Sequence, residues 1–595
     1  MKREIRSSSI AGTAGVGAVI DVGQESFVIP GLDRWKQEQL RVIQLRRLSD
    51  RLKKVLKAPR EGNPSLLVRR FPRAMFCEKC RRITMWKTEL EKEGEEPKCP
   101  HEGCAGPLVP MRFVAACERG HLDDVDWRRW AHSGAHAKPG CRHYGKLKFV
   151  VDPTASTGGL ASLKVECECG SWRSLEEIAN KAIVKEVFPC CSGTHPWIVG
   201  SAETCPAAVV VLQRGATNLH YPDTISALDI PVDIEESPVS QFAEQVKAHG
   251  LFQKLLTFIR GTGNTKDLID GFVTVIAQQV GCDEAVVLEI ATAEVEGRAV
   301  TGGKMKSQLT GPVEQGVFLE EEWRTMRAAL NAGEMISGTF AAVAEELDGA
   351  APQWLRSLVE RVLLIRRLRE VRAYLGFQRV KPGPAERRVS PDVGHPENWL
   401  AATEVFGEGF VLALNFAALE RWSKSLPASE LNAIADLEKK RLDENFWFLP
   451  KVDPAFLAIH TLSHLLLRQV TFDCGYSSSS LRERIYFDRI NQYAGLMIYT
   501  ADADSEGSLG GLVRQGRSDR LARSIIAAVE QGRWCSSDPV CSETAGQGLG
   551  GFNHAACHAC CLVSETSCTH ANTLLDRRML IDPAWGLLPR LGAEL

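Results

Sequence analysis

Cysteine is the residue that most constrains how this chain can fold, because its 19 copies are distributed unevenly. Eleven lie between Cys77 and Cys205, six lie between Cys535 and Cys568, and only two lie elsewhere. Several are close enough in sequence for two thiolates to reach one ion. Such clusters form disulfides in oxidising compartments and bind metal in reducing ones.

The N-terminal sequence favours the second of these uses. MKREIRSSSIAGTAGVGAVI begins with basic residues, but Gly and Ser interrupt the apolar segment that a signal peptide would need. No run of about 18 apolar residues predicts a transmembrane helix. We therefore expect a cytoplasmic protein that contacts no membrane. Its cysteines are expected to bind Zn²⁺ at two to four sites rather than to form disulfides.

Length and charge limit the remaining possibilities. A chain of 595 residues predicts three to four domains at roughly 150 residues each. The hydrophobic content of 44% is ordinary for globular proteins, so there is enough apolar chain to build cores without metal. The net charge of −2 provides no global attraction to DNA, so any nucleic-acid surface must be local.

The sequence predicts an α+β multidomain fold. It has a zinc-ribbon-like N-terminal part, a helical middle, and a mixed α/β C-terminal domain with a four-cysteine zinc site. The charged segment 381–399, rich in Pro and Gly, is typical of a long loop. The predicted regions are an N-terminal strand and basic helix (1–75), a cysteine-rich zinc-binding region (76–235), a mostly helical domain (236–380) and the C-terminal domain (400–595).

The first metal cluster consists of Cys77, Cys80, Cys99 and Cys104. Two residues separate the first pair, which lets both thiolates of a turn reach one ion, and 18 residues separate the two pairs. That spacing is normal for the return strand of a zinc ribbon. Four soft ligands suit tetrahedral Zn²⁺, so we expect a structural zinc site.

A second cluster begins with Cys167-Glu-Cys169, a tighter turn than usual. Two of the three cysteines that follow, Cys190, Cys191 and Cys205, could complete the site. We favour Cys191 with Cys205, and the choice between the adjacent pair stays open at this point.

A third site is possible at Cys117-x-x-x-His121 with Cys141 and His143, because this spacing permits a Cys₂His₂ site. The alternative is that Cys117 and His121 are simply buried structural residues.

The C-terminal cluster contains a Cys-x-x-Cys turn followed by a further cysteine at loop distance. Its predicted zinc ligands are Cys541, Cys557, Cys560 and Cys568. Cys535 and Cys561 are spare candidates. A redox dithiol or sensor at the Cys-x-x-Cys pair is the weaker alternative, because a thioredoxin-like site needs no such group of extra thiols.

Two segments, 33–57 and 354–375, are predicted to be basic amphipathic helices, since their apolar residues recur at helical spacing. A solvated helix face is the first interpretation of 33–57, and a salt-bridged structural helix is the first interpretation of 354–375. The alternative is a surface for DNA phosphates or an acidic partner. The side chains that would form such a surface are Arg46, Arg47, Arg51, Lys54, Arg366, Arg367, Arg369 and Arg372.

Motifs for catalysis are weak. The sequence has no G-x-x-x-x-G-K-[ST], so ATP binding by a P-loop is not expected. His460 and His464 lie four residues apart in an apolar helical run, without the Glu of H-E-x-x-H, and we expect them to be buried core histidines. Asp502 and Asp504 precede a Gly-rich turn and are expected to form an acidic loop. A metal site at either place is the alternative.

Several long motifs, in one order, resemble a known family. CERGHLDDVDWRRWAH (117–132), CSGTHPW (191–197) and LREVRAYLGFQR (368–379) resemble the DrmB family, components of the bacterial DISARM anti-phage defence system. HTLSHLLLRQVTFDCGYSSSSLRERIY (460–486) and CHACCLVSETSCTHANTLLDRR (557–578) resemble the helicase-associated zinc domain that DrmB shares with MrfA-type helicases. Together the resemblance covers roughly residues 10–230 and 355–595.

The resemblance implies a four-cysteine metal site at Cys541, Cys557, Cys560 and Cys568. It also implies a non-catalytic subunit that partners a DrmA-like helicase and supports the DNA binding and ATP hydrolysis of that partner. DNA would be contacted directly or through the partner, and the lack of a P-loop fits this division of labour. The alternative is a metal-dependent nuclease or hydrolase that uses His460/His464 or Asp502/Asp504.

Overall fold

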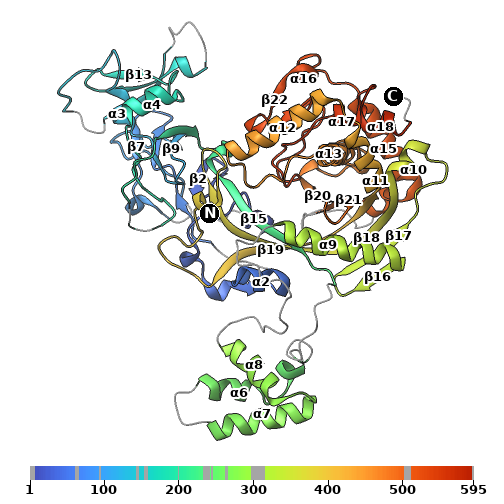
Figure 1. Cartoon of the computed structure of the whole chain (residues 1–595). Coiled ribbons are helices and arrows are strands. Elements are labelled where there is room, and N and C mark those ends of the chain that lie inside the picture. The colour runs from blue at the N-terminus through green and yellow to red at the C-terminus, as the bar shows by residue number, and fades with distance from the viewer. Residues whose placement is uncertain are drawn as a thin grey trace. The chain divides into compact units, whose positions relative to one another are not determined.

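The computed structural model describes residues 7–60, 66–92, 95–142, 146–152, 159–198, 200, 202–231, 242, 245–260, 266–295, 315–500 and 511–592. The chain forms two compact units, each built from three separate stretches (Figure 1). Unit 1 comprises Met1–Val42, Leu56–Ile225 and Ala373–Thr403, and unit 2 comprises Ile43–Val55, Ser226–Arg372 and Glu404–Leu595. The sequence predicts four consecutive regions, which do not coincide with these two units. The boundaries of those regions stay a prediction.

Unit 1 is built mainly of short strands. The strands are β1 (Val19–Val22), β2 (Glu25–Val28), β3 (Leu40–Val42), β4 (Val55–Pro59), β5 (Arg69–Arg70), β6 (Ala74–Cys77), β7 (Ile83–Met85), β8 (Leu108–Pro110), β9 (Phe113–Ala116), β10 (Leu122–Asp124), β11 (Leu147–Val151), β12 (Leu163–Cys167), β13 (Trp172–Ser174) and β14 (Val210–Gln213). Twelve of them form three-stranded antiparallel sheets in the orders β1-β2-β5, β7-β6-β8, β10-β9-β14 and β11-β12-β13, whereas β3 pairs with β4, which joins the larger sheet through β19. The α-helices are α1 (Ser7–Ile10), α3 (Trp127–Ala131) and α4 (Lys181–Val187).

Unit 2 combines helices with a larger β-sheet than those of unit 1. Its strands are β16 (Glu334–Ser337), β17 (Phe340–Glu345), β18 (Val359–Gln378), β19 (Trp399–Leu414), β20 (Leu481–Asp488), β21 (Tyr493–Thr500), β22 (Ala545–Gln547) and β23 (Asn553–His554). The main sheet has the order β16-β17-β18-β19-β21-β20. Strands β4, β18, β19 and β15 (Tyr221–Leu228) each contain residues of both units.

The helices of unit 2 are α2 (Arg46–Leu52), α6 (Phe252–Arg260), α7 (Lys266–Val280), α8 (Glu284–Val295), α9 (Gln315–Ala332), α10 (Gln353–Leu358), α11 (Phe416–Lys424), α12 (Ala428–Asp443), α13 (Pro454–Cys474), α14 (Gly511–Gln515), α15 (Ser518–Gly532), α16 (Val540–Glu543), α17 (Arg578–Ile581) and α18 (Leu587–Arg590). Single 3-10 turns lie at Leu32–Arg34, Gln37–Gln39, Thr88–Leu90, Gly159–Ser162, Thr217–Leu219, Ala385–Arg387, Ser478–Ser480 and Leu549–Gly551.

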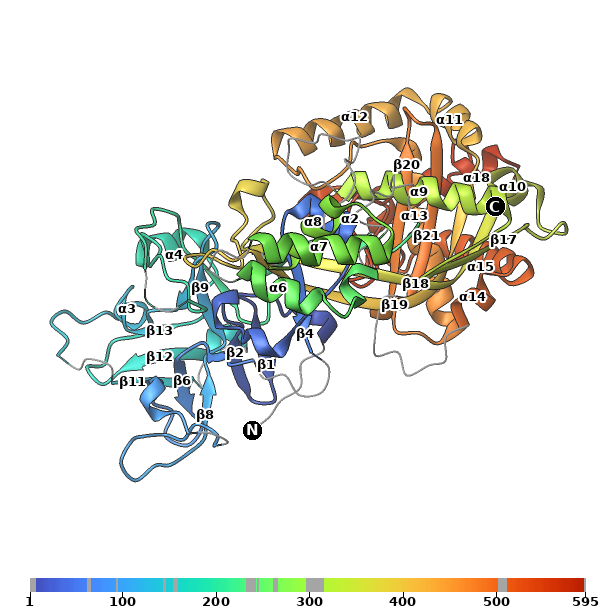
Figure 2. The same cartoon turned by 90° about the horizontal axis from the view of Figure 1, so that it is seen from below.

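Two helices cover opposite faces of the main sheet. Ile485, Leu496 and Ile498 belong to the apolar core that contains α13, whereas their neighbours Tyr486 and Met497 belong to the core that contains α9. Successive side chains of a strand point to opposite faces, so this alternation places α13 on one face and α9 on the other. Figure 2 shows α9 running along the sheet.

Helix α13 is the central element of unit 2. Asp453 caps its N-terminus by accepting a hydrogen bond from the Ala455 amide, and Pro454 occupies the first helical position. Gly475 ends the helix in a left-handed conformation, with φ of +70°. Most of the side chains between these ends are buried, so α13 is an interior helix that contacts β20, β21 and α15.

The helices α6, α7 and α8 pack together around an apolar cluster of their own. They account for the helical middle that the sequence predicts. Within the part of the chain that the structure describes, no single helix is long and apolar enough to span a membrane. The helix pair Asp267–Val280 and Glu284–Thr292 has the length and composition of a membrane span only when its two helices are taken together, and they are bent by 115°. Such a pair is weak evidence for a membrane span.

The structure contradicts most of the helix predicted in each of the two basic segments. In the segment 33–57 only α2 is an α-helix, and β3 and β4 flank it. In the segment 354–375 the helix ends at Leu358, and strand β18 follows. The run of Val, Leu and Ile in β18 fits a buried strand as well as a helix, so pairing with β17 and β19 decides the conformation.

Candidate metal centres

Among the described residues, at least five groups bring four side chains of metal-binding type together, with one ligand atom from each lying within 4.8 Å of the others. Zinc–sulfur bonds of about 2.3 Å in a tetrahedron place sulfur atoms about 3.8 Å apart. Neighbouring Sγ atoms in these groups are 3.5–3.9 Å apart, and the cysteines are free thiols rather than disulfides. The donor sets therefore fit Zn²⁺.

The ribbon site contains Cys77, Cys80, Cys99 and Cys104, the four residues that the sequence groups together. The Sγ atoms of Cys77 and Cys104 lie 3.5 Å apart, and those of Cys80 and Cys99 lie 3.7 Å apart. The first pair sits at the turn between β6 and β7, and the second pair precedes β8. A Cβ at Gly106 would lie 2.8 Å from the Sγ of Cys77, so a glycine is required beside the cluster.

The Cys117 site contains Cys117, His121, Cys191 and Cys205. The turn between β9 and β10 presents the first two, with 3.3 Å between the Sγ of Cys117 and the Nδ1 of His121. Cys191 and Cys205 face each other in an isolated β-bridge. The Nε2 of His121 lies 2.7 Å from a carboxylate oxygen of Glu203, the usual way in which a protein orients a metal-binding imidazole.

The His132 site contains His132, Cys141, Cys167 and Cys169. Cys167 ends β12 and Cys169 lies in the turn before β13. The Nε2 of His132 lies 3.3 Å from the Sγ of Cys169, and its Nδ1 hydrogen-bonds to the carbonyl of Arg128 at 2.7 Å. The carbonyl keeps the proton on Nδ1, which leaves Nε2 free to bind a metal.

The structure therefore contradicts two predicted groupings, although most of their members lie in one of the four-residue groups. The structure separates Cys167/Cys169 from Cys191/Cys205, and Cys117/His121 from Cys141. The pairing of β14 with β9 explains part of this, since Val210 lies opposite Ala116 and so brings the chain before β14 beside Cys117. His143 lies outside the described residues, and His132 was missed because it is distant in sequence from the cysteines it joins.

The Cys535 site contains Cys535, Cys541, Cys557 and Cys560. Their Sγ atoms lie 3.5 Å apart for Cys535 and Cys557, and 3.8 Å apart for Cys541 and Cys560. Cys535 follows α15 and Cys541 lies in α16, whereas the other two follow β23. Cys535, one of the spare candidates, thus takes the position predicted for Cys568. The other spare, Cys561, is fully buried outside this group.

The His460 site contains His460, His464, Glu483 and Cys568, all buried. The two histidines lie in α13, are hydrogen-bonded and are fully buried, as the first interpretation of the sequence expects. The sequence does not reveal that Glu483 of β20 and Cys568 join them. Asp502 and Asp504 lie outside the described residues.

Backbone amides support several of the sulfur atoms. The Sγ atoms of Cys169, Cys191, Cys535 and Cys568 each accept a hydrogen bond from the amide two residues later, at 3.3–3.4 Å. Such bonds stabilise a thiolate over a thiol. Side-chain hydrogen bonds from Cys561 lower the pKa of Cys560 to about 5 against the effect of burial. A hydrogen bond from Cys191 likewise lowers the pKa of Cys117 to about 5.

Basic residues of the two predicted helices are mostly paired inside unit 2. Arg47 and Arg372 are buried, so they cannot reach a phosphate at the surface. Arg46 and Lys54 also have partners within the chain. The ion pairs are Arg47 and Arg51 with Glu321, Arg369 with Asp229 and Glu404, and Arg372 with Glu370. The ion pairs of Arg369 and Arg372 agree with the salt-bridged interpretation of 354–375, whereas the burial of Arg47 differs from the solvated face expected of 33–57.

Arg366 and Arg367 differ from the other six, because both are exposed. The pairing of β17 with β18 shifts register here: Ala341 lies opposite Arg367 and Ala342 lies opposite Ile365. Arg366 is therefore the extra residue of a β-bulge, which lets two consecutive side chains reach solvent. No ion pair of either arginine is found among the described residues.

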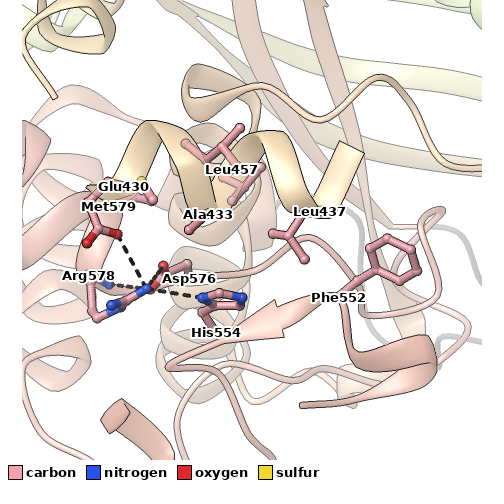
Figure 3. A pocket seen from close by; sticks show the side chains of 10 residues that line it. Glu430, Ala433, Leu437, Leu457, Phe552, His554, Asp576, Arg578 and Met579 are labelled. Carbon is pink, nitrogen blue, oxygen red and sulfur yellow. Dashed lines mark hydrogen bonds and ion pairs between the residues drawn. The ribbon is translucent and has the colours of Figure 1, made fainter. Parts of the chain in front are cut away.

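A cavity between α12, α13, β23 and α17 is far smaller than an active site. Figure 3 shows Arg578 at its edge, with ion pairs or hydrogen bonds to Glu430, Asp576 and His554. The cavity measures about 10 Å³, which is enough for about one water molecule. It therefore leaves no room for a nucleotide or another organic substrate.

Comparisons with known proteins agree with this architecture. Residues 6–221 match a domain of unknown function, DUF8724, which contains the three sites of unit 1. Residues 462–561 match the MrfA Zn-binding domain. That match includes Cys535, Cys541, Cys557 and Cys560 and ends before Cys568, so the four-cysteine cluster of the structure fits this zinc-binding domain.

The chain is also similar over nearly its whole length to one curated protein, the DISARM protein DrmB of Bacillus paralicheniformis. The two sequences are 30% identical over 593 residues, which cover 94% of this chain and 97% of the relative. The order of motifs, the zinc-binding domain and this similarity lead to one conclusion: the chain belongs to the DrmB family.

Proposed function

We propose that this chain is a non-catalytic zinc-binding subunit of an anti-phage defence complex. In this proposal it partners a DrmA-like helicase in the cytoplasm and supports the DNA binding and ATP hydrolysis of that partner. The observation that carries the proposal is the 30% identity to a DISARM protein over 94% of the chain. A relationship of that extent covers both units rather than one shared module.

The form of the metal sites supports a structural role. Each group supplies four protein ligand atoms, the number that closes the coordination of structural Zn²⁺, whereas catalytic zinc keeps one position for water or substrate. His460 and His464 are fully buried beside Glu483 and Cys568. This arrangement disfavours the alternative of a hydrolase at these histidines, because neither water nor a phosphodiester has access to them.

Arg366 and Arg367 are the proposed contact for DNA phosphates or for the partner, being the exposed members of the basic set. Arginine at this bulge would add affinity without reading sequence, because phosphate contacts are the same for every base. Binding through such contacts weakens steeply as salt is raised.

The test is to co-purify the chain with the helicase encoded beside it and to compare ATPase activity and DNA binding with and without the chain. We expect the complex to form and both activities to rise. The variant Arg366→Glu/Arg367→Glu should weaken DNA binding or complex formation. Arg517→Glu/Arg523→Glu, at two other exposed positions of unit 2, makes the same change in net charge and serves as control.

Two results would contradict the proposal. One is DNA cleavage by the purified chain alone with Mg²⁺ or Mn²⁺, abolished by His460→Ala. The other is a helicase whose ATPase activity and DNA binding are the same with and without this chain. Equal effects of the two charge-reversal pairs would remove the bulge as the contact and leave the subunit assignment in place.

A further inference from the structure

Four side chains from distant parts of unit 2 converge at the His460 site, which the match to the zinc-binding domain covers only in part. His460 and His464 are one helical turn apart and face the same side of α13. Glu483 lies in β20 with its side chain toward α13, while the next residue, Arg484, points to the opposite face and pairs with Glu322 of α9. Cys568 comes from the C-terminal segment.

The hydrogen bonds of the imidazole rings fix where their protons are. The Nδ1 atom of His460 lies 3.2 Å from the carbonyl of Leu574, and that of His464 lies 3.0 Å from the carbonyl of Cys561. A carbonyl only accepts, so each Nδ1 carries a proton and donates it. In a neutral imidazole the Nε2 atom then has a lone pair and no hydrogen.

Both lone pairs point at another acceptor. The Oε1 atom of Glu483 lies 2.9 Å from the Nε2 of His460 and 3.2 Å from the Nε2 of His464. The Sγ of Cys568 lies 3.3 Å from the Nε2 of His460. Neutral imidazoles offer no hydrogen for the two contacts with Glu483, so each would be a repulsion between lone pairs. A cation among these atoms turns all of them into ligands.

Charge leads to the same result. Without a metal, hydrogen bonds at both contacts need two imidazolium ions beside one carboxylate, a net charge of +1 among side chains that are fully buried. With a divalent ion, one carboxylate and one thiolate balance the two positive charges, and both imidazoles stay neutral. Burying an unbalanced charge is costly, so the balanced arrangement is favoured.

We propose that His460, His464, Glu483 and Cys568 bind one divalent transition-metal ion, Zn²⁺ in the first instance, separate from the ion of the Cys535 site. Two nitrogens, one oxygen and one sulfur form a borderline donor set of the kind zinc takes. The contacts of 2.9–3.3 Å are slightly shorter than the edges of a zinc tetrahedron, about 3.3–3.6 Å, so a small outward shift admits the ion.

The site would be structural. All four ligands are buried protein side chains, and the carbonyls that orient the two imidazoles belong to the same C-terminal segment as Cys568. One ion would therefore fasten α13, β20 and the segment around residues 561–574 to one another. This role is independent of the proposed partner and of DNA.

The test uses the full chain and two measurements. The first is zinc per chain by inductively coupled plasma mass spectrometry. His464→Gln should lose about one equivalent, whereas His464→Cys, which supplies another zinc ligand, should keep it. Leu466→Ala removes a buried side chain from the same helix and should lower the melting temperature without loss of metal. The second is anomalous diffraction at the zinc edge from crystals of the unaltered chain.

A zinc peak bounded by the two Nε2 atoms, Oε1 and Sγ would support the proposal even if His464→Gln fails to fold. It is overturned if the unaltered chain shows anomalous peaks at the Cys535 site but none here. It is also overturned if folded His464→Gln retains the zinc content of the unaltered chain. Helicase partnership plays no part in either measurement, so the result is separable from the fate of the proposed function.

Discussion

The ribbon site and the Cys535 site have the same donor set but very different surroundings. The buried cluster around the ribbon site consists of Met75, Cys77, Trp86, Cys99 and Leu108, so two of its five members are themselves proposed ligands. Cys535, Cys541 and Cys560 belong to a much larger apolar core that also contains much of α13.

This difference indicates two uses of one metal. Beside the ribbon site the apolar cluster is small, although Ala74 and Ile83 also pack into the larger core of unit 1. A bound zinc ion would there supply much of the free energy that holds the ligand loops. Where a large core already exists, zinc fastens a loop to it, and the hydrophobic effect keeps the remainder folded. The same four-cysteine site can thus be essential for the folding of one module and can stabilise only a loop in another.

Removal of metal should have the largest effect and should separate the two sites. With a strong zinc chelator, we expect residues 74–110 to lose nearly all protection from hydrogen exchange, because zinc contributes about 10 kcal/mol or more to the folding of small zinc modules. Residues 454–474 should stay protected by their apolar core. Hydrogen exchange read by mass spectrometry, with and without chelator, measures both. Simultaneous loss of protection in the two segments would show that the comparison is wrong.

Counting metal in double variants should sharpen the comparison inside unit 2. Cys557→Ser should lose one zinc equivalent, and adding Cys535→Ser should lose no more, because both belong to one site. Adding Cys568→Ser to Cys557→Ser should lose a second equivalent, because Cys568 belongs to the His460 site. The opposite outcome is that adding Cys535→Ser loses a second equivalent and adding Cys568→Ser loses none. It would mean that Cys568, as the sequence predicts, is the fourth ligand rather than Cys535.

Sequence spacing predicts a metal site well when its ligands are local. The structure brings together the four cysteines that spacing groups at the ribbon site, because they lie at the end of β6 and in the loops beside the paired strands β6, β7 and β8. Cys191, which the sequence favours over Cys190, lies opposite Cys205 in the structure, although the two join Cys117 and His121 rather than Cys167 and Cys169. Spacing does not predict the ligands where tertiary packing brings them together. His132 lies beside Cys169 because α3 packs on β12, and no local sequence pattern indicates that contact.

Secondary structure shows the same limit. The helix α13 is recognisable from its apolar run and its cap at Asp453, since a cap is a local signal. The strand β18 is not, because its arginines mimic the polar side of a helix. Two of them, Arg369 and Arg372, are in fact paired with carboxylates, which only the assembled sheet provides.

A smaller effect is expected at the carboxylate that orients His121. Glu203→Gln keeps the size of the side chain but weakens its hydrogen bond to Nε2, and loss of such a contact lowers metal affinity about tenfold. The side chain is 60% exposed, so the effect should lie near that lower limit. Alkylation of Cys117 and Cys205 during chelator titration measures it. Glu176→Gln, at another exposed position of unit 1, is the control and should change nothing.

The smallest effect is expected at Cys190, the neighbour in sequence of Cys191 in the Cys117 site. Cys190 is exposed and lies outside the group, whereas the Sγ of Cys191 accepts the amide of Gly193 and faces Cys205. Cys190→Ser should therefore retain all zinc and change the free energy of unfolding by less than about 0.5 kcal/mol, as for other surface substitutions. Cys191→Ser should lose one equivalent. The metal content and thermal unfolding of the two variants test this expectation. Equal loss of zinc from both would mean that either thiol can bind the metal, and that the strand pairing around Cys191 does not select the ligand.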